Sequence, residues 1–357
     1  MAQLSVAGPA QGITVNVILK YTLIAIAALA APLLFPEYQI QLAWLWLMVV
    51  FALTWDAVGG QMGYNSFGNV FYFGLGMYVT AVVQRDLYYD FEEYETLAGS
   101  LDTLPPADYL TGMSLGLAAS AVCAVLCAIV LGSGILRLRG HYFAICTLGL
   151  GIAAGEIAAG IDYIGAGSGL VTPVFPDGLG EKGLFFCYLL LALAAVTFLV
   201  LRWLYTSRFG LAINAIRDDE DKAEAMGLHT TRYKTIAWCV SGFFLAIAGG
   251  IMGDLIGFID PVDTAFAGAT FGVWMVLMAI LGGKGTLWGP VIGATIFHVT
   301  QEIFWTFLFG WQRVALGALI VIIVVFFPQG VMGFARARWP DRFGHRVESV
   351  ADKGATQ

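Results

Sequence analysis

The chain consists mainly of long apolar segments, each about the length needed to cross a lipid bilayer. A membrane-spanning helix needs about 20 predominantly apolar residues, and about ten stretches of the chain meet that requirement. Only 12% of the 357 residues are charged, whereas an average soluble domain has about 25%. The sequence therefore predicts an all-α polytopic membrane protein with about ten transmembrane helices, some of them broken by glycine.

The predicted spans are separated by polar segments and by prolines. Proline removes a backbone donor and disfavours helix continuation, so Pro36 and Pro328 are expected to end the first and the last span. Ala28-Leu29-Ala30 resembles a signal-peptidase site, but the apolar run is long and no basic cluster precedes it, so we expect the first span to be retained. The spans are expected at residues 17–35, 41–58, a glycine-rich stretch ending near 83, 110–131, a stretch ending near 160, 184–203, 235–257, 265–281, 287–308 and 314–327.

The basic residues are distributed unevenly between the two sides of such a bundle. With ten spans and both termini inside, 15 of the 18 bases fall on the cytoplasmic side, as the positive-inside rule requires. Residues 84–109 fall outside and carry seven acids with one base, Arg85. The chain thus divides into a cytoplasmic segment 1–16, a transmembrane domain 17–335 and a basic cytoplasmic tail 336–357, with an acidic periplasmic loop at 84–109 and a cytoplasmic loop at 204–234.

The longest charged run, residues 215–227, lies between the sixth and seventh predicted spans. Two bases and five acids stand between Arg217 and Glu224, and Gly227 follows them. A charged stretch between two spans must lie in water, and a glycine can end a short helix there. The run is either a docking surface for a soluble partner or a solvated connector with scattered charge.

Glycine is dense in residues 59–76, which indicates either broken backbone or very close helix packing. Non-helical backbone at membrane depth is tolerated only against protein or a water-filled cavity. Polar side chains can line such a cavity, whereas packing of helices through glycine involves no substrate. The candidates for a translocation path in this stretch are Gln61, Asn65, Ser66, Asn69 and Tyr72.

Acids inside the predicted spans are costly, and such residues are often functional. Glu156 lies deep in the fifth span, and Asp56 lies towards the end of the second. Glu156 can bind a substrate ammonium or line a polar route; alternatively, it is protonated or paired with another helix. Asp254 lies near the outer end of the seventh span, where we expect water to screen it.

The motifs of several enzyme classes are missing from the sequence. Gly283-Lys284-Gly285 does not complete a phosphate-binding loop, because Gly285 replaces Ser or Thr and Met278 stands where the first glycine is required. Neither a nucleophile elbow nor a zinc pattern occurs, and the five cysteines lie in apolar segments. The chain has no evident means of holding ATP, and we expect it to be no enzyme.

Three segments together resemble the permease subunit of branched-chain amino acid ABC importers, of the LivM type. Each glycine-rich segment is weak alone, but their order and the Ala-Glu-Ala-Met-Gly sequence make the set specific. The resemblance covers about residues 40–335. The segments are Leu136-Arg-Leu-Arg-Gly-His-Tyr-Phe-Ala-Ile-Cys-Thr-Leu148, Ala215-Ile-Arg-Asp-Asp-Glu220 continuing to Gly227 and Thr231-Arg-Tyr-Lys234, and Leu281-Gly-Gly-Lys-Gly-Thr-Leu-Trp-Gly-Pro290.

The resemblance implies an ABC importer permease fold in a bacterial inner (plasma) membrane, with lipid around it and both termini in the cytoplasm. It implies that the charged run is the coupling loop that inserts into a cytoplasmic ATPase. The coupling residues are then expected to be Arg217, Asp218, Asp219, Glu220, Glu224, Ala225 and Gly227.

The partners that the resemblance implies are two cytoplasmic ABC ATPases, a second homologous permease subunit and a periplasmic amino-acid-binding protein, with no nucleic acid. ATP and Mg²⁺ would be bound by the ATPases, and this chain would bind no cofactor or metal. The binding protein would deliver an amino acid, and ATP would drive alternating access. A weak site suffices for such a path, because a tight one would impede release.

Two departures from the family pattern bear on the substrate. The family commonly has Ser-Leu-Gly-His where this chain has Ser66-Phe-Gly-Asn69, and Thr-Gly-Gly-Ser-Asp-Gly-Leu where it has Ile164-Gly-Ala-Gly-Ser-Gly-Leu170. The second loop adds Gly167, Ser168 and Gly169 to the candidate path. The alternatives are a urea or short-amide permease of the same family, a proton-coupled secondary transporter that uses Glu156 or Asp56, and a channel.

Overall fold

The computed structural model describes residues 15–90, 92, 94, 104–307, 311, 314, 317, 318, 321 and 330–338, and these residues are mostly helical. Within them, six helices are long and apolar enough to cross a membrane. They span Pro36–Gly59, Pro106–Ile135, Gly140–Ala159, Lys182–Thr206, Thr230–Ile256 and Pro261–Gly282. Most of the expected tenth span at 314–327, the segment before residue 15 and most of the tail lie outside the described residues.

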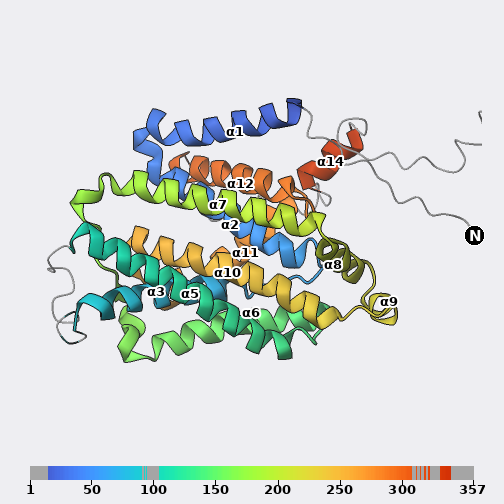
Figure 1. The fold of residues 1–357 in the computed structure, drawn as a ribbon, viewed down its shortest axis with the longest axis horizontal. Coiled ribbons are helices and arrows are strands. Elements are labelled where there is room, and N and C mark those ends of the chain that lie inside the picture. Colours follow the sequence, from blue (N-terminus) through green and yellow to red (C-terminus); the bar gives the residue numbers. More distant parts are fainter. Residues whose placement is uncertain are drawn as a thin grey trace, which may run out of the picture.

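The helices run side by side, with the short helices α8 and α9 together at one end of the bundle (Figure 1). We call this the α8–α9 end. The α-helices are α1 Val15–Leu34, α2 Gln39–Gly59, α3 Asn69–Tyr88, α5 Pro106–Ile135, α6 Gly140–Ala159, α7 Lys182–Thr206, α8 Arg208–Asp218, α9 Glu220–Ala225, α10 Thr230–Ile256, α11 Val273–Gly282, α12 Trp288–Phe307 and α14 Gly330–Arg338. The shorter elements are η1 Pro36–Tyr38, η2 Asp162–Ile164, η3 Ala166–Ser168, β1 Leu170–Val171, η4 Asp177–Leu179, β2 Phe258–Ile259, η5 Pro261–Ala265 and η6 Gly268–Gly272.

Helix α10 packs extensively on α3 and α5, which also pack on each other, while α2 packs mainly on α7, α10 and α12. Glycine lets α3 and α10 approach closely. A Cβ atom at Gly76 would lie 2.0 Å from the Ala246 carbonyl oxygen, and one at Gly249 would lie 2.0 Å from that of Phe73. Because lipid is as apolar as the side chains, the hydrophobic effect does not drive helices together in a membrane. Small residues at such crossings allow the close van der Waals packing that holds the helices together instead.

Two segments interrupt the α-helices. The backbone is non-helical from residue 60 to 68, between α2 and α3, which is one of the two arrangements that the glycine content indicated. The expected eighth span at 265–281 is only partly α-helical, because the π-helical turns η5 and η6 precede α11. Asp260 stabilises the first of these turns, since its Oδ1 accepts hydrogen bonds from the Val262 and Asp263 amides.

The loop after α6 is fastened to the end of the bundle away from α8 and α9. Its strand β1 pairs antiparallel with β2, with Leu170 opposite Ile259. Arg85 of α3 donates to the Tyr163 carbonyl oxygen at 2.8 Å, and its guanidinium lies over the Tyr163 ring. The predicted acidic loop at 84–109 is framed by longer helices than expected: α3 continues to Tyr88, and α5 begins at Pro106.

The close glycine contacts lead to a stability prediction. We expect Gly249→Ala to lower the free energy of unfolding by about 1–3 kcal/mol, because the added methyl meets backbone rather than a movable side chain. Gly134→Ala on α5 is the matched control, since a Cβ atom there has open space around it and alanine favours a helix by about 0.5–1 kcal/mol. Thermal unfolding of both purified variants in the same detergent compares them; equal melting temperatures would contradict the packing argument.

Candidate functional site

The candidate site is the pair of short helices α8 and α9, whose ends are fixed by local capping. Ser207 caps α8 by accepting a hydrogen bond from the Phe209 amide, and Asp219 caps α9 by accepting one from the Lys222 amide at 3.1 Å. At the other end of α9, Gly227 adopts a φ of +86° and its amide donates to the Glu224 carbonyl. The Leu228 amide donates to the Ala223 carbonyl, which completes a Schellman motif. Gly227 therefore ends the short helix, as predicted.

α8 is amphipathic and lies against the bundle. Its Ile213 and Ile216 side chains are buried, and the helix contacts α7 and α10. Arg217 and Asp218 lie at its last turn and pair with each other on the exposed side. The buried face of α8 therefore fixes the position from which α9 extends.

Glu220, the first residue of α9, holds that helix to the bundle through a buried polar network. The Lys234 ammonium of α10 is buried and lies 2.7 Å from Glu220 Oε1. Lys234 Nζ also donates to the Leu136 carbonyl oxygen at 2.7 Å and to the Tyr64 hydroxyl at 3.1 Å. The Tyr64 hydroxyl donates to the other Glu220 oxygen, so both carboxylate oxygens are paired.

The network determines the charge state of Glu220. Burial acts to raise its pKa, but the hydrogen bonds from Lys234 and Tyr64 and the charges of Lys234 and Arg139 outweigh this effect. The pKa of Glu220 therefore lies below its ordinary value. Burial and the hydrogen bond to Glu220 raise the pKa of Tyr64. At neutral pH the pair is thus a carboxylate with a neutral phenol that donates to it.

Arg139 bridges the start of α6 to three acids of α9. Its guanidinium lies 2.6 Å from Asp221, 3.3 Å from Glu220 and 3.7 Å from Glu224. These pairs are partly exposed and individually weak. Together they orient α9 on a second side, because Arg139 precedes α6 whereas Lys234 belongs to α10.

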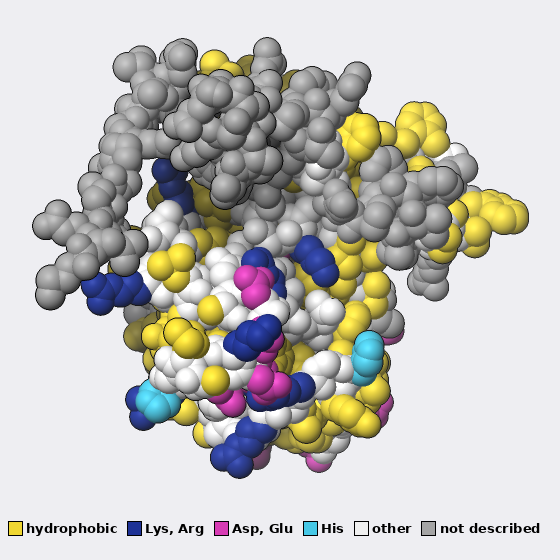
Figure 2. All heavy atoms as spheres, turned by 90° about the vertical axis from the view of Figure 1, so that its right-hand side faces the viewer, with side chains coloured by type: hydrophobic (Ala, Val, Ile, Leu, Met, Phe, Trp, Pro, Cys, Tyr) yellow, Lys and Arg dark blue, Asp and Glu magenta, His cyan; other side chains and the backbone are white. Residues whose placement is uncertain are grey.

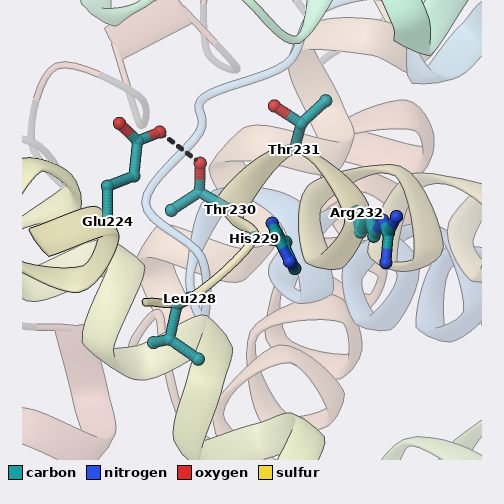
Figure 3. A pocket seen from close by; sticks show the side chains of 6 residues that line it. All are labelled: Glu224, Leu228, His229, Thr230, Thr231 and Arg232. Carbon is teal, nitrogen blue, oxygen red and sulfur yellow. Dashed lines mark hydrogen bonds between the residues drawn. The ribbon is translucent and has the colours of Figure 1, made fainter. Parts of the chain in front are cut away.

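A surface pocket of about 460 Å³ lies where α9 passes into α10 (Figure 3). The Thr230 hydroxyl donates to the Glu224 carboxylate at 2.6 Å across this junction. Acidic, basic and apolar groups all line the pocket, so it can accept a side chain of mixed character. The lining residues are Glu224, Leu228, His229, Thr230, Thr231 and Arg232.

The face that surrounds this pocket carries both signs of charge (Figure 2). On α9 and its C-terminal end, Asp221 and Lys222 have side-chain exposures of 79% and 84%, and Met226 is 84% exposed. An exposed methionine next to charged groups is typical of a contact surface rather than of a bundle interior. The expected coupling residues therefore divide: Glu220 faces the bundle, whereas Asp218, Asp219 and Glu224 are at least partly exposed.

The expected path residues of the glycine-rich stretch lie between the helices, near the α8–α9 end and towards the middle of α10. Gln61, Ser66, Asn69 and Tyr72 are buried, whereas Asn65 is exposed. The Ser66 carbonyl oxygen accepts a hydrogen bond from the Trp55 indole. The side-chain amide of Asn69 donates to the Ser241 hydroxyl at 3.3 Å. The Tyr72 ring packs edge-on against Trp238.

The other expected path residues lie elsewhere. Glu156 is exposed on the last turns of α6, so it does not point into the bundle of this chain. Gly167 and Ser168 are also exposed, and Gly169 packs against Phe258 and Ile259. A Cβ atom at Gly167 would lie 4.0 Å from the Ala159 carbonyl oxygen, so this group lies beside the C-terminal end of α6. The structure thus separates the expected path into two groups.

The structure also brings in residues that the sequence did not single out. Tyr64, Arg139 and Lys234 build the network around Glu220. Arg139 and Lys234 belong to the segments that carry the family resemblance, but no role was expected for them. Asp254 was expected to be screened by water, which is wrong: it is 2% exposed and is buried near the C-terminal end of α10. Its position on the helix was clear from the sequence, but not the face that it occupies.

The Glu220 network predicts how firmly α9 is held to the bundle, and how this depends on pH. A carboxylate with a lowered pKa stabilises the docked α9 fully above its unfolded pKa of about 4.3, and this contribution is lost as the pH falls through the lowered value. We expect Glu220→Gln to speed hydrogen exchange of the α9 amides roughly ten-fold at neutral pH, because a hydrogen bond to a charged group contributes about 1.5–3 kcal/mol. Asp221→Asn, which removes an exposed carboxylate that pairs with Arg139, is the control and should change little. Equal effects of the two substitutions would contradict the role of Glu220.

The chain is similar over most of its length to permease proteins of branched-chain amino acid transport systems. The family described as branched-chain amino acid transport system / permease component matches residues 39–324. The high-affinity branched-chain amino acid transport system permease protein LivM of Escherichia coli is 26% identical, covering 93% of this chain and 80% of that protein. LivM of Salmonella typhimurium is 25% identical, covering 91% and 77%. No solved structure matches the chain.

A shorter similarity links the chain to a second kind of permease. The LivH permease protein of Escherichia coli is 28% identical over 128 residues, which are 36% of this chain and 40% of that protein. The family and the apolar helices indicate a multi-pass inner-membrane protein. Since the family match covers most of the sequence, the chain belongs to the family of permease components of branched-chain amino acid transport systems, and it is a transport component rather than an enzyme.

Proposed function

We propose that the chain is a transmembrane subunit of an ATP-driven importer that moves branched-chain amino acids by alternating access. The observation that supports this most directly is the α8–α9 unit. It is fixed to the bundle on two sides by Lys234 and Arg139, yet it presents exposed charges and Met226. A rigid element with an exposed mixed surface is suited to receiving a force from a partner and passing it on.

The partner at this surface is proposed to be a cytoplasmic ABC ATPase, with two such ATPases in the complex holding ATP and Mg²⁺. Asp218, Asp219, Glu224, Ala225 and Gly227 would form the contact or its supporting turn. Arg217 and Glu220 would hold the unit to the bundle. The pocket between α9 and α10 would receive a side chain of the ATPase, because it offers apolar, acidic and basic groups together.

We propose ten spans in total, with both termini in the cytoplasm. The six apolar helices would be joined by α1, α3, α12 and the segment 314–327. This arrangement is supported by the distribution of the bases, since 15 of 18 then lie on the α8–α9 side of the membrane. The acidic segment 84–109 would face the periplasm, where a binding protein delivers the amino acid.

A second homologous permease is proposed to complete the path. Only 33% of the apolar stretch of α5 and 28% of that of α6 are buried, against 78% for the helix Pro36–Gly59 that contains α2. Their exposed sides are therefore available to lipid and to another permease. Glu156, Gly167 and Ser168 lie on or beside α6, so this path group would face the partner, while the Gln61–Tyr72 group would lie on the inner side.

The docking surface can be tested with substitutions that spare the fold. We expect the double variant Lys222→Ala, Met226→Asp to lower co-purification of the ATPases and amino acid uptake roughly ten-fold or more, because central interface residues contribute about 2 kcal/mol or more. Its melting temperature should stay near the wild-type value, since both side chains are exposed and neither contacts Arg139 or Lys234. Asp263→Lys, an exposed acid beyond the opposite end of α10, is the control and should leave ATPase binding intact. Undiminished ATPase association of the double variant would contradict the proposal.

The substrate class can be tested by competition. In vesicles that contain the complete transporter and its binding protein, we expect unlabelled isoleucine and valine to reduce uptake of labelled leucine, whereas urea should not. Uptake should need ATP and should persist when the transmembrane pH gradient is collapsed. Inhibition by urea alone, or uptake that follows the pH gradient without ATP, would contradict the proposed substrate or energy source.

A further inference from the structure

Three segments that are remote in sequence meet beneath the last turn of α8. They are the end of α2 with Asp56, the loop from Gly60 to Gly63, and the turn between α11 and α12. A Cβ atom at Gly63 would lie 3.0 Å from Arg217 Cγ, and one at Gly285 would lie 3.4 Å from an Arg217 guanidinium nitrogen. Arg217 therefore rests on both loops, and α8 contacts them directly.

Asp56 forms the link between two of these segments. It is 1% exposed, and its Oδ1 accepts a hydrogen bond from the Gly285 amide at 2.7 Å. Its Oδ2 has no hydrogen-bond partner among the described residues. Only glycine fits at position 60, because a Cβ atom there would lie 1.8 Å from Asp56 Oδ1 and 2.6 Å from the Gly285 amide nitrogen. Burying an acid with so few hydrogen bonds costs free energy, and acids kept in membrane spans despite this cost are often functional.

The turn that Asp56 holds is stiff. The Thr286 hydroxyl donates to the Gly283 carbonyl oxygen at 2.8 Å and accepts from the Gly289 amide at 3.0 Å. A Cβ atom at Gly282 would lie 1.7 Å from the Gly289 carbonyl oxygen. Because α11 and α12 are in such close contact at this turn, a displacement of the turn moves both helices together.

Two bases lie beside the bonded amide. Arg217 of α8 packs close to Gly285, and Lys284 directly precedes Gly285 in the turn and is exposed. An asparagine at position 56 would keep a side-chain oxygen that can accept the hydrogen bond from the Gly285 amide.

We propose that Asp56 is a positioning residue for transport: it ties the α11–α12 turn to α2 beneath Arg217, so that movement of α8 and α9 is passed to α11 and α12. The inference rests on the proposed function, since an ATPase is needed to move α8 and α9. The glycines of the turn then serve mechanical coupling, and their resemblance to a phosphate-binding loop is incidental.

The first test concerns the contact and needs the isolated permease only. In Asp56→Ala, we expect hydrogen exchange at the Gly285 amide to rise roughly ten-fold or more, because its buried acceptor is lost. Asp56→Asn retains an acceptor and should change exchange less. Asp254→Ala removes an acid that is equally buried near the other end of the bundle and is the matched control. Unchanged Gly285 exchange in Asp56→Ala, or an equal rise in Asp254→Ala, would overturn the proposal.

The second test concerns coupling in the complete transporter, reconstituted with its ATPases and binding protein. We expect Asp56→Ala to hydrolyse ATP within about two-fold of wild type while the amount of amino acid moved per ATP falls roughly ten-fold. The amount of amino acid moved per ATP by Asp56→Asn should lie between those of wild type and Asp56→Ala, and this variant serves as the test if the alanine variant does not assemble. A wild-type amount per ATP in both variants, or ATP hydrolysis and uptake that fall in equal proportion, would overturn the proposal. Loss of the proposed function itself would show separately, as a wild-type permease that binds no ATPase.

Discussion

The docking of α9 depends on the buried ammonium of Lys234. A charged lysine inside a bundle is tolerated only if an acid and hydrogen-bond acceptors meet it, and Glu220, Tyr64 and the Leu136 carbonyl supply these groups. Because Glu220 is the first residue of α9, neutralising the lysine also fixes the helix. The exposed surface of α9 is thus held in place by a contact that lies beneath it. This separation lets the outer residues serve recognition while the inner ones serve attachment.

The local part of this unit was readable from the sequence, and the non-local part was not. Gly227 was predicted to end a helix because a glycine after a charged run has a local meaning, and the structure gives it a positive φ. The partners of Glu220 are different, since Tyr64 lies 156 residues away and Asp221 finds Arg139 at a distance of 82 residues. No local pattern encodes such pairs. Membership of Glu220 in a charged run suggested exposure, whereas the fold placed it inward.

The glycine-rich segments show why composition alone left two readings open. Glycine permits both a broken backbone and a close helix crossing, because both need the absence of a Cβ atom. Residues 60–68 realise the first and Gly76 the second. At Gly60 the reason is a third one: the space of its side chain is occupied by the Asp56 carboxyl group. Only the three-dimensional neighbours separate these cases.

The acids of the spans make the same point about orientation. An apolar helix that lacks a polar stripe shows where an acid lies along its length but not which way it faces, so the positions of Glu156, Asp56 and Asp254 were known while their surroundings were not. The structure places Glu156 on the outside, Asp56 against a backbone amide and Asp254 in the interior. Helix α10 carries Lys234 near its first turn and Asp254 near its last, and it is continuous between them. A single continuous helix therefore joins the docked α9 to the loops at the opposite end of the bundle, and a displacement at one end must be accommodated at the other.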